Sequence, residues 1–201
     1  MKKLNLIIAA ALSIGMLQAC HNGAKDSTQT ADSVNAAKDT SKMADSSAKD
    51  TTKMAATTPD NDDSKFCVAA ADAGMTEIAL SKAALTITTN AKIKDFANMM
   101  ITDHTAAANK LMALAKAKGI ALPNAPSADH QKAIDDISKK TGADFDKAYV
   151  DQMVGDHKGA VSLFTGESKN AVDPDLKAFA TNTLPTLQGH LDAINAIKKG
   201  M

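Results

Sequence analysis

From residue 65 onward, apolar residues recur every three or four positions in four long segments, and no stretch alternates as a strand does. This spacing predicts long helices over 65–88, 90–118, 143–169 and 173–199, with a shorter helix over 127–140. Asn90, Ser127 and Asp173 are typical N-caps, and Gly119 is a typical residue after a helix. Asp63 or Ser64 is expected to cap the first segment. Four long helices predict an all-α four-helix bundle.

The composition and the loop lengths refine this prediction. Apolar residues make up 44% of the 201-residue chain, much of it alanine, and aromatic residues only 3%. Alanine favours helices, whereas aromatic and β-branched residues favour strands. The first two long helices join by a tight turn, as do the last two, but residues 119–142 form a long connection with its own helix. This pattern favours a ferritin-like bundle with a short extra helix in the crossover.

Several function classes are excluded by composition. The 23 basic residues are all lysine and balance 23 acidic residues, with one Tyr and no Trp, so no nucleic-acid partner is expected. Two cysteines cannot form a disulfide-rich scaffold. Phosphate loops, dinucleotide fingerprints and nucleophile elbows are absent, so no small-molecule substrate is evident and we favour a non-catalytic protein.

The first 64 residues predict export and a tether. Lys2 and Lys3 precede an apolar stretch over 4–16, too short to cross a bilayer, and Leu17-Gln18-Ala19-Cys20 resembles a bacterial lipobox. We expect a signal peptide over 1–19, lipidation of Cys20 and anchoring in the cell envelope, at the outer membrane. The alternative is a plain secreted protein. Residues 20–64 are expected to form a disordered linker, because large apolar residues are scarce there, and residues 65–201 the bundle.

One motif occurs twice, at an offset of 53 residues. Residues 96–104 and 149–157 share the pattern aromatic-x₃-Met-apolar-x-Asp-His, which indicates duplication or a shared role. A helical wheel turns His104 and His157 toward the apolar face of their helices, with Asp103 and Asp156 at its edge. Glu77 and His190 take similar positions on the first and last long helices. All lie near mid-helix, within about 6 Å in height, which predicts one polar layer across the bundle.

This layer has two interpretations. The first is a transition-metal site for Zn, Fe, Mn or Cu, without catalysis, because buried charges require a partner or a metal. Its ligands would be Glu77, His104, Asp156, His157 and His190, with Asp103 at the edge; in a Cu(I) variant, Met100 and Met153 would contribute thioethers. The second is a hydrogen-bonded network that only fixes helix register, in a structural or stress-related envelope protein with macromolecular partners. His130 is expected at the solvated surface and Cys67 as a small buried apolar residue.

Particular residues also carry a family resemblance. They are Phe66, Gly74, Glu77, Asn90, Phe96-Ala-x-x-Met100-x-x-Asp103-His104, Phe145-Asp-x-x-Tyr149, Met153-x-x-Asp156-His157 and Leu184-Pro185 ahead of His190-Leu191. The stretch from Phe66 to Ala193 resembles the bacterial domain of unknown function 4142 family, predicted outer-membrane proteins. This resemblance implies an exported, ferritin-like helical bundle without an established activity. The chain is also distantly similar to periplasmic copper-binding bundles, but it lacks the Glu-x-x-His pair of ferritins.

Overall fold

The computed structural model describes residues 26–44 and 59–201. In these residues it contains six helices and no strand: α1 (Ser27–Ala44), α2 (Asn61–Ile87), α3 (Ala91–Lys118), α4 (Ala128–Ser138), α5 (Gly142–Asn170) and α6 (Pro174–Lys199). The predicted all-helical fold is confirmed. The signal peptide over 1–19, Cys20 and the linker segments 21–25 and 45–58 lie outside the described residues.

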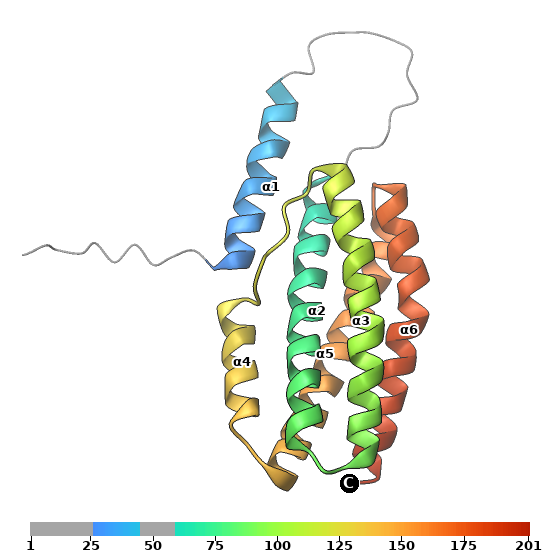
Figure 1. Ribbon diagram of the computed structural model, residues 1–201. Coiled ribbons are helices and arrows are strands. Elements are labelled where there is room, and N and C mark those ends of the chain that lie inside the picture. Colours follow the sequence, from blue (N-terminus) through green and yellow to red (C-terminus); the bar gives the residue numbers. More distant parts are fainter. Residues whose placement is uncertain (1–25, 45–58) are drawn as a thin grey trace, which may run out of the picture.

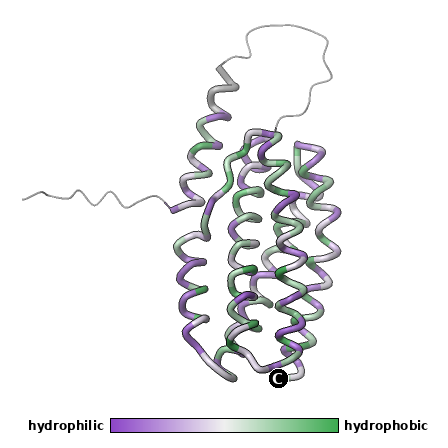
Figure 2. Tube along the Cα trace, in the orientation of Figure 1, coloured by the Kyte–Doolittle hydropathy of each residue, from purple (hydrophilic) through white to green (hydrophobic). Residues whose placement is uncertain are grey.

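The four long helices α2, α3, α5 and α6 lie side by side (Figure 1). Tight turns join α2 to α3 and α5 to α6, so each of these pairs is antiparallel. The connection from α3 to α5 passes along the bundle and carries α4, which packs against α2 and α5. As a result α3 and α5 run in the same direction, the crossover that the long connection predicts. Figure 2 shows apolar residues recurring along every long helix.

Local side-chain hydrogen bonds cap the N-termini of most helices. The side chains of Asn90, Ser127 and Asp173 cap α3, α4 and α6 as predicted, and Gly119 ends α3 in the left-handed conformation, at φ 69°. α6 continues through Pro185 as one helix.

The predicted start of the first long helix was wrong by four residues. Asp60 caps α2, because its carboxylate accepts hydrogen bonds from the amides of Asp62 and Asp63. Asp63 has another role: its buried carboxylate accepts hydrogen bonds from the amides of Val172 and Asp173 in the α5–α6 turn. The carboxylate expected to begin a helix therefore ties two helical hairpins together.

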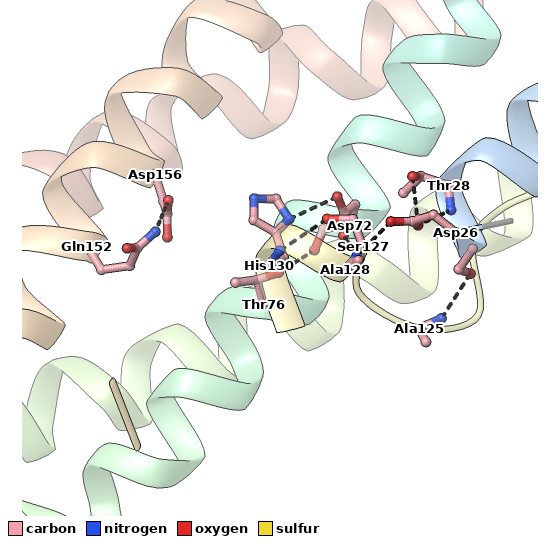
Figure 3. Close-up of polar contacts among 11 residues, drawn as sticks. Asp26, Thr28, Asp72, Thr76, Ala125, Ser127, Ala128, His130, Gln152 and Asp156 are labelled. Atoms are coloured by element: carbon pink, nitrogen blue, oxygen red, sulfur yellow. Dashed lines mark hydrogen bonds and ion pairs between the residues drawn. The ribbon is translucent and has the colours of Figure 1, made fainter. Parts of the chain in front are cut away.

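The prediction of a disordered linker over 20–64 was wrong for residues 27–44, which form α1. Asn35 is 6% exposed and exchanges two hydrogen bonds with the backbone of Ala121, at 3.0 and 2.7 Å. Asp26 accepts hydrogen bonds from the amides of Thr28 and Ala128, so one carboxylate caps both α1 and α4 (Figure 3). These long-range polar contacts compensate for the few apolar residues of α1, and a helical-periodicity argument does not detect them.

The apolar core consists of two clusters. One lies toward the α2–α3 turn and includes Ile93, Phe96, Met100, Tyr149 and Met153; the other lies toward the opposite end and includes Phe66, Leu111, Phe164, Phe179 and Leu187. On each long helix, buried ionisable residues separate the two clusters: Asp72 and Glu77 on α2, His104 on α3, His157 on α5 and His190 on α6. The polar layer therefore divides the core across its middle.

No helix in the described part of the chain combines the length and the hydropathy needed to cross a bilayer.

We predict that Glu167 makes the stability of the bundle pH-dependent. Burial, together with Asp63, Asp60, Asp62 and Asp173, raises the pKa of Glu167 to about 7. The folded state therefore retains a proton on Glu167 that the unfolded state loses above about pH 4.5. The stability that this proton contributes is present below pH 4.5 and disappears as the pH rises from 4.5 to 7. Glu167→Gln should gain stability relative to the wild type over this interval in urea unfolding. A difference that does not vary with pH would contradict the assignment.

We predict that Asn35 holds α1 against the crossover. Asn35→Ala removes both hydrogen bonds to Ala121 and leaves two backbone groups unpaired, at a cost of about 1–2 kcal/mol. Amide hydrogen exchange should become faster throughout α1 but not in α2. Asp32→Ala, on the exposed side of α1, is the control and should leave exchange unchanged. Equal exchange in both variants would show that other contacts dock the helix.

Candidate metal site

Each of the four long helices places one ionisable side chain in the middle of the bundle. Glu77 on α2, His104 on α3, His157 on α5 and His190 on α6 are 1%, 7%, 0% and 3% exposed. The single polar layer that the sequence predicts is therefore present. We call these four residues the polar layer.

Every histidine of the layer uses one ring nitrogen for a hydrogen bond. His104 Nδ1 lies 3.0 Å from Glu77 Oε2, and His190 Nε2 lies 2.8 Å from Asp103 Oδ2. His157 Nδ1 lies 2.8 Å from the carbonyl oxygen of Met153 and 3.5 Å from Glu77 Oε1. A carbonyl only accepts hydrogen bonds, so His157 Nδ1 carries a proton.

The remaining ring nitrogens are buried without a hydrogen-bond partner in the described part of the chain. They are Nε2 of His104, Nε2 of His157 and Nδ1 of His190. One ring nitrogen of each histidine lies within 4.8 Å of one from each of the others, and the ring centroids are 5.3–5.7 Å apart. Each imidazole therefore has one ring nitrogen paired with an oxygen atom and one buried ring nitrogen left without a partner, in a group of three rings that lie side by side.

Burial favours neutral imidazoles in this group. It lowers the pKa of both His157 and His190, although nearby carboxylates oppose the shift. Burial also opposes ionisation of Glu77, but the hydrogen bond from His104 and the neighbouring histidines together keep the pKa of its carboxyl below the usual value. The layer thus combines a carboxylate with imidazoles that can act as electron-pair donors.

Aromatic side chains pack beside the polar layer and contact two of its imidazole rings. The Phe96 ring lies edge-on to His157 and His190, with centroid separations of 6.2 and 6.4 Å. Phe96 and Tyr149, the aromatic residues of the repeated motif, also contact each other edge-on at 6.4 Å. The aromatic residue eight positions before each motif histidine therefore belongs to the packing beneath the polar layer.

Other residues of the predicted site take different places. Asp103 is at the edge, as expected: its side chain is 39% exposed and its partner is His190 rather than the adjacent His104. The structure does not bring Asp156 into the three-histidine group. Its Oδ1 accepts a hydrogen bond from Gln152, and burial together with the charge of Glu77 raises its pKa to about 6. Met100 and Met153 are fully buried in the core cluster beside Phe96.

The expectation that His130 is solvated was wrong. His130 on α4 is only half-exposed and lies 2.9 Å from Asp72 on α2, and Asp72 also accepts a hydrogen bond from the amide of Ser127 (Figure 3). The hydrogen bond to Asp72 raises the pKa of His130 despite its burial. This pair holds α4 against the bundle, and the amphipathic pattern of α4 alone does not indicate the partner. Cys67, in contrast, is fully buried as expected, and burial raises its pKa to about 12.

Fold and site define an all-helical bundle protein with three converging histidines in its core. The family model of the domain of unknown function DUF4142 matches residues 46–197, and the chain belongs to this family. No curated protein matches the sequence. The fold is similar to a crystal structure of a DUF305 fragment from Deinococcus radiodurans, with a TM-score of 0.63 and 13% identity, covering 72% of this chain and 99% of that one.

We predict that Glu77 stabilises the fold far more than Asp103. Glu77→Ala leaves two buried histidines without their carboxylate and should cost about 3 kcal/mol, whereas solvent can replace Asp103 and Asp103→Ala should cost about 1 kcal/mol. The free energy of unfolding in urea measures both costs. Asp95→Ala, an exposed carboxylate on α3, serves as the control. Equal costs for the first two variants would contradict the buried pairing.

Proposed function

We propose that this protein is a lipid-anchored lipoprotein of the bacterial envelope whose ferritin-like bundle binds one divalent transition metal ion without catalysis. The ligands are the ring nitrogens of His104, His157 and His190. The observation that carries the proposal is the convergence of three buried imidazoles, which bring ring nitrogens within 4.8 Å of one another and each of which keeps one ring nitrogen without a hydrogen-bond partner.

The required geometry is close to the one present. Metal–imidazole bonds of about 2.0–2.1 Å separate the nitrogens of a tetrahedral site by about 3.4 Å. The nitrogens therefore need to approach by no more than about 1.4 Å, which small rotations of the rings can provide. A cation bound by the unpartnered ring nitrogens also removes the cost of burying them without a partner.

The outward hydrogen bonds are those of a metal-binding histidine. Ligating imidazoles usually donate their second N–H to a carboxylate or a carbonyl oxygen, which fixes tautomer and ring orientation. Glu77, Asp103 and the carbonyl of Met153 supply these acceptors here. Three imidazoles without a direct carboxylate ligand suit Zn²⁺ or Cu²⁺ better than Mn²⁺, which prefers oxygen.

The anchor and the location are parts of the same proposal. The lipobox-like residues ending in Cys20 support lipidation, and the apolar stretch over 4–16 after Lys2 and Lys3 supports export. In this proposal the lipidated Cys20 binds the membrane, and the bundle binds the metal ion. Cys20→Ala should release the protein from the membrane fraction, and unchanged fractionation would refute the anchor.

We predict binding of one Zn²⁺ or Cu²⁺ per chain. Calorimetric titration should show this stoichiometry, and saturating metal should raise the Tm by roughly 5–10 °C, reversed by a chelator. His190→Ala should weaken binding at least a hundredfold because it removes one of three ligands. His130→Ala is the matched control, since that histidine lies outside the group, and should bind as the wild type does.

A Tm that does not respond to metal or chelator, together with no stoichiometric binding, would overturn the proposal. That result would favour the second interpretation, in which the polar layer only fixes helix register and the protein acts through its surface. Circular dichroism of each variant separates loss of a ligand from loss of the fold.

A further inference from the structure

An apolar cavity of about 800 Å³ reaches the polar layer from one side. All four long helices and the start of the crossover line it, mostly with alanine, leucine, methionine and phenylalanine. His104, His190, Glu77 and Asp103 also line the cavity. His157 does not, and it is fully buried. The cavity therefore reaches the polar layer at Glu77, His104 and His190.

The cavity exists because the residues above the polar layer, on the side away from the α2–α3 turn, are small. On α2, Ala70, Ala73 and Gly74 precede Glu77, and on α3, Ala106 and Ala107 follow His104; all five line the cavity. A Cβ atom added at Gly74 would meet no atom within 4 Å. Larger side chains would fit at these positions, so the cavity results from the small side chains and not from the arrangement of the helices.

Three histidines leave a metal coordination sphere incomplete. Zinc sites of this type hold four ligands, and a site with three protein ligands takes the fourth from water or a bound molecule. In the part of the chain that the structure describes, no fourth His, Cys, Asp or Glu belongs to the group. The fourth ligand must therefore come from outside, and the cavity leads to the site.

We infer that the metal site takes a small, uncharged, largely apolar molecule with one donor atom as its fourth ligand, bound in this cavity. This inference rests on the proposed metal binding. The charge balance favours an uncharged ligand. The carboxylates of Glu77 and Asp103 already balance the two charges of a divalent ion, so an anionic ligand would add an unbalanced charge in the interior. The apolar walls favour a hydrophobic body on the donor.

Co²⁺ in place of the native metal makes the coordination visible in the d–d absorption spectrum. The probes are 4-phenylimidazole and imidazole, which share a donor but differ in apolar surface. Both should change the spectrum of the Co²⁺-loaded protein, and 4-phenylimidazole should bind at least tenfold more tightly because its phenyl ring enters the cavity.

Two variants fill the cavity from different helices. Ala107→Phe on α3 and Gly74→Leu on α2 should each weaken 4-phenylimidazole binding at least tenfold while Co²⁺ binding is retained. Ala117→Phe, at an exposed position of α3 outside the cavity, should change neither. If one filled variant fails to fold, the other provides the same comparison.

The outcomes separate the two proposals. Failure of Zn²⁺, Cu²⁺ and Co²⁺ alike to bind would overturn metal binding and the fourth ligand together. Co²⁺ binding with a spectrum that neither probe changes would leave metal binding intact and refute the open position. Equal affinity for the two probes, or a filled variant that binds 4-phenylimidazole as the wild type does, would refute the role of the cavity.

Discussion

The fold depends on the pairing of the four buried side chains of the polar layer, with one another and with Asp103, in one cross-section of the bundle. Glu77 contacts histidines from two other helices, and Asp103 reaches across from α3 to α6. A shift of one helix by a single turn, about 5.4 Å, would break these contacts and bury unpaired charge. The polar layer therefore sets the register in which two otherwise permissive apolar clusters pack. Alanine-rich helices need this constraint, since small side chains interlock weakly.

The same hydrogen bonds that fix the register also create the electron-pair donors. Each imidazole pairs one ring nitrogen with a carboxylate or a helix carbonyl, and its other ring nitrogen stays buried without a partner. A network that served register alone would leave these nitrogens unsatisfied. Register and the proposed metal binding are thus compatible interpretations of the layer, because the pairing that fixes the register is the pairing that a metal-binding imidazole needs.

The long helices and the polar layer were predictable because both follow from local spacing. Caps such as Asn90 and Asp173 and the repeated Asp-His motif are readable within a few residues of the chain. Three features were not predictable from the sequence: the contacts of α1, the His130–Asp72 pair and the separation of Asp156 from the histidines. Each of these depends on a partner 55 or more residues away, or on which side of a helix a neighbour lies, and no helical periodicity records that. Asp156 and His157 are adjacent, so they point about 100° apart, and the packing of α5 against α6 and α2 decides which one faces the core.

The two halves of the core differ in a way that matches the chemistry of the layer. Below it, Phe96, Tyr149, Met100 and Met153 fill the interior, and the Phe96 ring supports two imidazoles at fixed orientation. Above it, the second cluster packs around Phe66, Phe164 and Phe179, but alanine and glycine beside this cluster leave space that reaches two of the histidines. Filling that space would stabilise the bundle, because each buried methylene contributes roughly 0.8 kcal/mol. Under the proposed metal binding, the fully packed side positions the ligands and the more open side admits their partner.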